Sequence, residues 1–242
     1  MNLKLSNLII YRKGFTLVEV LMVMGIIGII AALALPLIIV HINTSKFRTQ
    51  FKKTLSTLNQ SVKMSEAHYD LNFASVTQGC VTPTDSPVTR ASMCAIINGS
   101  VANATFYTSD TIPNMGGVGQ YSPTGVGVTA AKKDIFLFAD GSLFAYDKGI
   151  TGCSLEAGSD VDGLKSICYG FIDVNGVTAP NKAVSCGNGD TKITKKIGNC
   201  IVRNNSVDMG DVFPVAIHDG TVEPLTNAAK SVLGTSPMNT KD

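Results

Sequence analysis

The stretch FTLVEVLMVMGIIGIIAALALPLIIV, residues 15–40, decides the fold of this 242-residue chain, and Glu19 is its only charged residue. About 20 apolar residues are enough for a helix to cross a bilayer. A signal peptide that is removed after its apolar region has a site of small residues there, whereas bulky residues 37–40 lead directly into a basic segment. We therefore predict a membrane-spanning helix that the mature protein retains.

The rest of the chain is almost balanced in charge. The net charge is +2, and three cations lie ahead of the apolar stretch, which leaves −1 after Gly14; these cations are Lys4, Arg12 and Lys13. A domain that binds nucleic acid over a broad surface carries a clear excess of basic residues. The composition therefore gives no support to that class of function.

All six cysteines lie beyond the apolar stretch, at Cys80, Cys94, Cys153, Cys168, Cys186 and Cys200. None forms a C-x-x-C pair, which argues against zinc and redox motifs. Taken in order they pair at separations of 14, 15 and 14 residues, although six cysteines allow about fifteen connectivities. Disulfides require an oxidising compartment, so we expect an extracytoplasmic domain. The alternative is six free buried thiols.

The junction before the apolar stretch reads RKG-FTLVE, residues 12–19. It resembles the class III signal of type IV pilins and pseudopilins, in which a basic leader ends in Gly and is followed by Phe, an apolar helix, and a Glu four residues beyond the Phe. The resemblance implies that a prepilin peptidase cuts between Gly14 and Phe15 and methylates the new amino group of Phe15. Residues 1–14 are then a leader, and removing 14 of the 242 residues leaves 228.

Glu19 has a physical role to fill as well as a place in the motif. An acidic side chain within a bilayer costs about 2.5–3.5 kcal/mol on insertion scales and is normally paired or functional. After cleavage the amine of Phe15 is cationic, so the Glu19 of a neighbouring subunit can pair with it. The resemblance implies the same contact, which sets the axial register of a filament. The alternative is that Glu19 snorkels to the inner interface.

Pro36 and Gly28 are the other assembly residues that the resemblance indicates. Pro36 lacks a backbone donor and is expected to kink or break the helix around residues 30–32. In pilin filaments the helix often becomes extended between a glycine and a proline placed like Gly28 and Pro36. An ordinary transmembrane kink is the alternative.

Beyond the span, residues 41–70 continue as an amphipathic helix. Apolar residues recur at helical spacing with lysines between them; they are Phe47, Phe51, Leu55, Leu58 and Val62. We expect this stripe to pack on a sheet. Residues 71–133 are rich in Ser, Thr, Gly and Pro and are expected to be a variable loop region.

Residues 134–242 are expected to form the sheet, with the disulfide loops. Three turn signals, Asp140-Gly141, Asn175-Gly176 and Asp219-Gly220, each favour a hairpin with a type I′ turn. They predict an antiparallel sheet of four to six strands, followed by one short helix and a loose tail. The fold class is therefore α+β, and the resemblance implies a type IV pilin-like fold.

Little in the sequence supports catalysis or a cofactor. The histidines are His41, His68 and His218, and no nucleophile motif accompanies them. Asp173 and Asn175 are weak calcium candidates, joined further along by Asp208 and Asp211, but their spacing does not fit an EF-hand. Turn chemistry accounts for Asn175-Gly176 without a metal, so we predict no enzyme and no cofactor.

The segment between Cys186 and Cys200 is a candidate contact for DNA or a host surface, because it holds Lys192, Lys195 and Lys196. Such runs are more often simply solvated, and no aromatic residue lies between these lysines to stack on bases.

The function that fits these features is that of a structural subunit, major or minor, of a bacterial type IV pilus. Its expected partners are further pilin subunits of the same or other kinds, the inner membrane, the prepilin peptidase and the pilus assembly platform. We expect it in the inner membrane before assembly and in an extracellular filament afterwards. The alternatives are a pseudopilin of a type II secretion system and a membrane-anchored adhesin or DNA-binding minor pilin.

Overall fold

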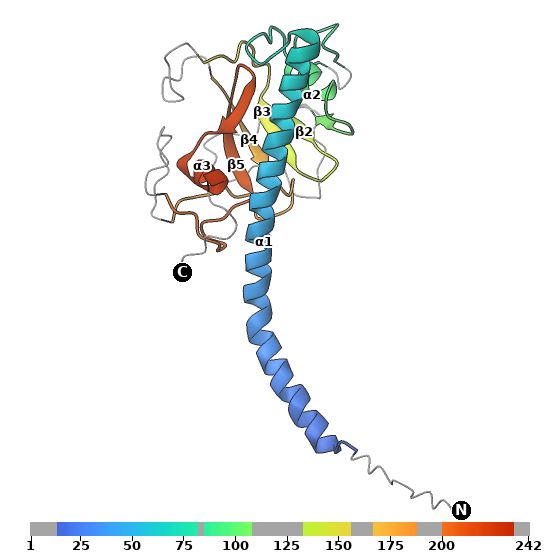
Figure 1. Ribbon diagram of the computed structural model, residues 1–242, viewed down its shortest axis with the longest axis vertical. Helices are drawn as coiled ribbons and strands as arrows, with labels where there is room; N and C mark the ends of the chain where they lie inside the picture. Colours follow the sequence, from blue (N-terminus) through green and yellow to red (C-terminus); the bar gives the residue numbers. More distant parts are fainter. Residues whose placement is uncertain (1–13, 82–84, 108–132, 156–166, 188–199, 235–242) are drawn as a thin grey trace, which may run out of the picture. The chain divides into compact units, whose positions relative to one another are not determined.

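The structure is a computed structural model, and it describes residues 14–81, 85–107, 133–155, 167–187 and 200–234, without the side chains of residues 36–41. The chain divides into two compact units, Met1–Val40 and His41–Asp242, and each is described by itself (Figure 1). The basic leader residues and the lysines between Cys186 and Cys200 lie outside the described residues, as does the tail after residue 234.

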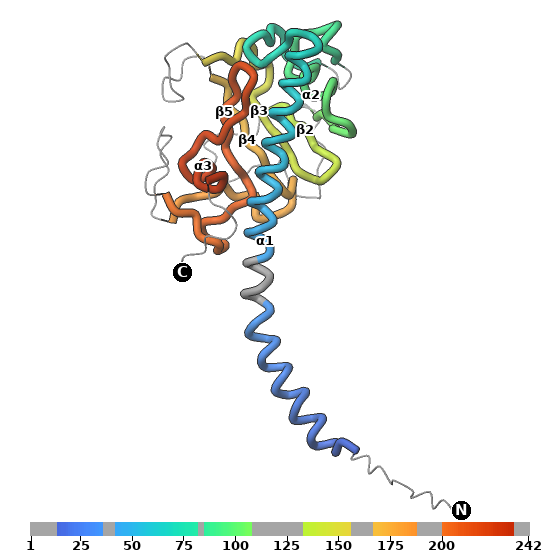
Figure 2. The backbone as a smooth tube through the Cα atoms, viewed as in Figure 1, coloured from blue at the N-terminus to red at the C-terminus, as the bar shows by residue number. Residues whose placement is uncertain are grey.

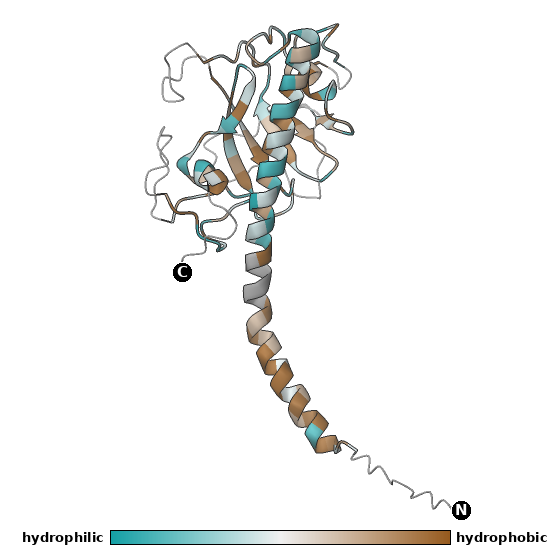
Figure 3. Cartoon of the chain, viewed as in Figure 1, coloured by the Kyte–Doolittle hydropathy of each residue, from teal (hydrophilic) through white to brown (hydrophobic). Residues whose placement is uncertain are grey.

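The first unit contains the beginning of helix α1, Leu17–Tyr69. Its segment Leu17–Leu35 is long and apolar enough to cross a membrane, by length and composition. Figure 3 shows that hydrophobic residues dominate this part of α1. The helix continues through Gly28 and Pro36, and Figure 2 traces its described part as a smooth backbone tube. The extended stretch therefore stays a prediction for an assembled filament.

The second unit is built around a six-stranded sheet with the order β1-β2-β3-β4-β5-β6, in which all neighbours are antiparallel. This confirms the predicted antiparallel sheet of four to six strands. The strands are β1 Thr105–Tyr107, β2 Lys133–Leu137, β3 Leu143–Asp147, β4 Cys168–Asp173, β5 Val212–His218 and β6 Thr221–Pro224. The described residues of this unit also contain two short helices, α2 Met93–Asn98 and α3 Asn227–Gly234.

The later part of α1 packs across one face of this sheet (Figure 1). The ring of Phe51 stacks on that of Phe213 in β5, with 4.1 Å between the ring centroids. Leu55, Leu58 and Val62 are buried in the same core cluster. The apolar stripe of the sequence is thus the surface that joins helix to sheet, which confirms that expectation.

The predicted loop region, residues 71–133, contains α2 and β1, which both lie in the apolar run ASMCAIINGSVANATFYT. Six residues are too few to show helical periodicity, so the sequence pattern does not reveal α2. Its start is fixed by Ser92, whose hydroxyl accepts a hydrogen bond from the Ala95 N–H at 3.2 Å, a typical N-cap. The disulfide Cys80–Cys94 ties this helix to the chain before it.

Two of the three turn signals do connect neighbouring strands, but neither turn is of type I′. Between β2 and β3 the Gly141 N–H donates to the Phe138 carbonyl and the Phe138 N–H to the Ser142 carbonyl. With Gly141 at φ 85°, this is a three-residue loop with a left-handed glycine. Between β5 and β6, only Asp219 has a left-handed φ, of 45°, whereas type I′ needs one at both loop positions.

The third signal, Asn175-Gly176, is a turn but not a hairpin, which corrects that prediction. β4 ends at Asp173, and its other neighbour in the sheet is β5, which begins at Val212. The side-chain amide of Asn175 donates to the carbonyls of Thr178 and Ala179. These bonds fold the chain back on itself, so no strand comes directly after the turn.

Candidate processing and assembly site

The site begins at the residues before helix α1. Thr16 is the last residue before the helix, and Glu19 is its third helical residue. The Glu19 N–H donates to the Thr16 hydroxyl at 3.3 Å. In return, the Thr16 N–H and hydroxyl donate to the Glu19 Oε2 at 3.3 and 3.2 Å. This reciprocal pair is a capping box.

The capping box gives Glu19 a second role, within its own chain, and the sequence pattern also indicates this role. Thr separated by three residues from a Glu, just before an apolar run, is the sequence signature of such a box. Within the described residues both bonds end on Oε2, and a carboxylate can accept through both oxygens. Oε1 can therefore accept a second donor while the helix stays capped.

Phe15 and Gly14 lie outside the helix, next to this cap. The side chain of Phe15 is 83% exposed, and a Cβ added at Gly14 would meet no atom within 4 Å. A processing enzyme can therefore reach the peptide bond between them, as far as the described residues are concerned. The site consists of the accessible peptide bond between Gly14 and Phe15 and, directly after it, a capped helix that carries an acid at its third residue.

A comparison with family models matches residues 10–35 to the model described as the prokaryotic N-terminal methylation motif. The chain carries this methylation motif. The match includes Gly14, Phe15, Glu19 and Gly28, and it ends before Pro36. Comparisons with curated proteins and with solved structures find no match to the chain.

The methylation motif is the class III signal of type IV pilins and pseudopilins, which confirms the resemblance seen in the sequence. It supports a pilin-like or pseudopilin protein, and it indicates a structural subunit rather than an enzyme. It also implies processing by a prepilin peptidase and assembly into pilus-like filaments. The motif covers only the beginning of the chain. It does not include the second unit, His41–Asp242, which we call the head.

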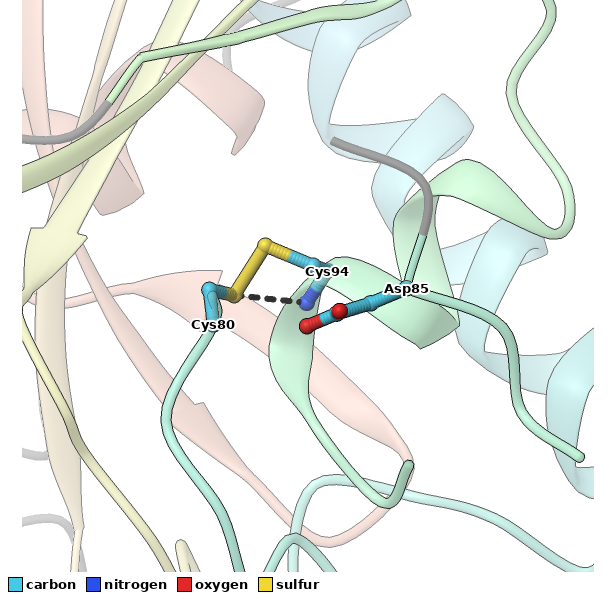
Figure 4. Close-up of side chains that lie close together, drawn as sticks. All are labelled: Cys80, Asp85 and Cys94. Atoms are coloured by element: carbon cyan, nitrogen blue, oxygen red, sulfur yellow. Dashed lines mark hydrogen bonds between the residues drawn. A yellow bond between two sulfur atoms is a disulfide. The ribbon is translucent and has the colours of Figure 1, made fainter. Parts of the chain in front are cut away.

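The six cysteines form three disulfides, Cys80–Cys94, Cys153–Cys168 and Cys186–Cys200. Each joins residues that are close in sequence, as expected from pairing in order. One pair lies beside an acid, since the sulfurs of Cys80 and Cys94 and a carboxylate oxygen of Asp85 lie within 4.8 Å of one another (Figure 4). Because both sulfurs are bonded to each other, they are not thiolates that could hold a metal.

The carboxylates among the weak calcium candidates accept hydrogen bonds within the chain, whereas the buried Asn175 Oδ1 has no partner within the described residues. Asp173 is buried and accepts a hydrogen bond from the Asn175 N–H at 3.2 Å. The two carboxylate oxygens of Asp211 accept from the N–H groups of Lys182 and Asn181, at 2.7 and 2.9 Å. These contacts explain the aspartates as supports of the loop.

The histidines do not form a catalytic arrangement in the described part of the chain. The ring of His218 lies between two carboxylates, with Nδ1 3.2 Å from Asp219 and Nε2 3.3 Å from Glu223. It therefore braces the β5–β6 hairpin. His68 lies in the last turn of α1, and the side chain of His41 is outside the described residues.

Proposed function

We propose that this protein is a structural subunit of a bacterial type IV pilus, held first in the inner membrane and then in an extracellular filament. The observation that carries the proposal is the order of residues at the start of α1. A methylation motif places Gly14 and Phe15 ahead of a helix that is long and apolar enough to cross a membrane, with Glu19 in its first turn.

In the proposed sequence of events, the leader keeps the new terminus masked until the peptidase removes it. The methylated amine of Phe15 then carries a positive charge beside an apolar surface. Glu19 of a neighbouring subunit accepts this amine, while its own Thr16 keeps the helix capped. The pairing relieves the cost of an acid in apolar surroundings, and it fixes the axial register between subunits.

The disulfide-bonded head fits this role. Each of the three bridges stabilises the folded head by restricting the unfolded chain, and such bridges persist outside the cytoplasm. A pseudopilin of a type II secretion system would carry the same motif. Electron microscopy of sheared surface material separates the two, since long surface filaments containing this chain support a pilus. An adhesive or DNA-binding task of the head would depend on the lysines between Cys186 and Cys200, which lie outside the described residues.

The state of Phe15 tests the proposal. We expect mass spectrometry of the protein from membranes to find a mature N-terminus at methyl-Phe15. Replacing Gly14 by leucine should leave the full leader in place, because the peptidase then meets a bulky side chain at the cut. A Cβ at this position meets no atom of the described residues within 4 Å, so the defect would report on processing and not on folding. An intact leader on the native protein would contradict the proposal and support a plain membrane anchor.

A further inference from the structure

Strand β6 forms one edge of the six-stranded sheet. β6 is the last strand of the sheet, and within the described residues only β5 pairs with it. An edge strand presents unpaired N–H and C=O groups, to which another chain can add a strand. The opposite edge, β1, is only three residues long, and short edge strands are themselves a protection.

The register of the β5–β6 hairpin shows which groups of β6 face outward. His218 and Thr221 flank the two-residue turn, and Val222 lies opposite Ile217. Hydrogen-bonded and non-hydrogen-bonded pairs alternate in an antiparallel ladder, and the pair that flanks a two-residue turn is hydrogen-bonded. The N–H and C=O of Val222 therefore point away from β5, and those of Thr221 point toward it.

The side-chain amide of Asn59 in α1 occupies both outward groups of Val222. The Val222 N–H donates to Asn59 Oδ1 at 2.7 Å, and Asn59 Nδ2 donates to the Val222 carbonyl at 2.9 Å. Nδ2 also donates to the Leu55 carbonyl at 3.1 Å, which holds the amide in place. The amide thus makes the two bonds that a neighbouring strand would make.

The next outward position of β6 is Pro224, which lies opposite Val215. Proline has no backbone N–H, so nothing there can donate to an incoming strand. Each outward donor position of Thr221–Pro224 is therefore either bonded to Asn59 or removed by proline. We propose that Asn59 is a blocking group on β6, which prevents a second copy of this chain from adding a strand to the sheet.

This role holds whether or not the protein forms pili, so the two proposals can fail separately. The test uses the full chain in detergent micelles. In the native protein, the Val222 amide should be protected from hydrogen exchange although it faces outward from an edge strand. In Asn59→Ala we expect its exchange to be roughly tenfold faster or more. We also expect detergent-corrected light scattering to show association that increases with concentration.

Three variants separate edge blocking from a general loss of stability. Gln60→Ala changes the exposed neighbour of Asn59 and should behave like the native protein. Val62→Ala weakens the buried face of the same helix and leaves Asn59 unchanged, and it should remain monomeric. Asn59→Asp keeps an acceptor for the Val222 N–H, so this amide should keep most of its protection from hydrogen exchange.

Two results would overturn the proposal. One is an Asn59→Ala protein that stays monomeric although its Val222 amide has become exposed to exchange. The other is a Val62→Ala protein that associates as strongly as Asn59→Ala, because association would then result from lost stability and not from an opened edge.

Discussion

Replacing Glu19 by alanine is expected to leave the protein cleaved and inserted in the membrane, but to lower its entry into filaments about a hundredfold. An acid in apolar surroundings costs about 2.5–3.5 kcal/mol unless it is paired, and every 1.4 kcal/mol or so corresponds to a factor of ten. Pairing with the Phe15 amine recovers this free energy only in the filament. The measurement is the ratio of sheared surface protein to membrane protein, by immunoblot.

The capping box makes it possible to separate the charge of Glu19 from its role in the helix. Glu19→Gln keeps a side chain that can complete the box but carries no charge, so we expect it to be nearly as defective as alanine. Thr16→Ala breaks the box and costs about 1 kcal/mol, while the charge remains, so its defect should be small. A Glu19→Gln protein that assembles normally would show that capping, and not pairing between subunits, is the role of this acid.

The sequence predicts well those features that depend on local periodicity. Phe51, Leu55, Leu58 and Val62 recur at helical spacing, and all four are buried against the sheet. Turn residues are less informative, because they specify a change of direction and not the element that comes after the turn. Asp219-Gly220 leads into β6, whereas Asn175-Gly176 leads into a loop, and the chain rejoins the sheet through the bridge between Ala183 and Val212.

Features that depend on distant residues could not be predicted. Nothing near Asn59 in sequence shows that it contacts Val222, because the two are brought together only when α1 packs on the sheet. The same holds for Arg48, whose guanidinium donates to the side chain of Asn204 and the carbonyl of Val202. The candidate site was identified more completely, since its residues lie within one turn of each other. The capping box is a further local signal, because Thr16 and Glu19 lie three residues apart just before an apolar run.

Asp211 holds the loop after β4 against the beginning of β5, and we expect its replacement to destabilise the head. Its two carboxylate oxygens accept from the N–H groups of Lys182 and Asn181, and its carbonyl accepts from the Val174 N–H at 3.0 Å. In Asp211→Asn one oxygen becomes an amide nitrogen, which leaves one partly buried N–H without an acceptor. That costs about 1–3 kcal/mol in the free energy of unfolding, measurable by denaturant unfolding at neutral pH.

The pH dependence of this deficit is set by the pKa of Asp211. Burial raises the pKa of its carboxyl above the ordinary value, although the N–H groups of Lys182 and Asn181 act in the opposite direction. The folded protein then binds a proton more readily than the unfolded chain. Its stability from this group therefore falls as pH rises from about 3.9, the ordinary value, through the raised pKa.

The asparagine variant lacks this titration, so its deficit relative to the native protein should be larger below about pH 3.9 than at neutral pH. Asp70→Asn removes an equal charge at an exposed position outside this network and serves as the control. A deficit that instead shrinks with acid would mean that the folded protein holds Asp211 as a carboxylate more firmly than the unfolded chain does. The hydrogen bonds from Lys182 and Asn181 would then outweigh burial, and the carboxylate would act as a charged anchor for the loop.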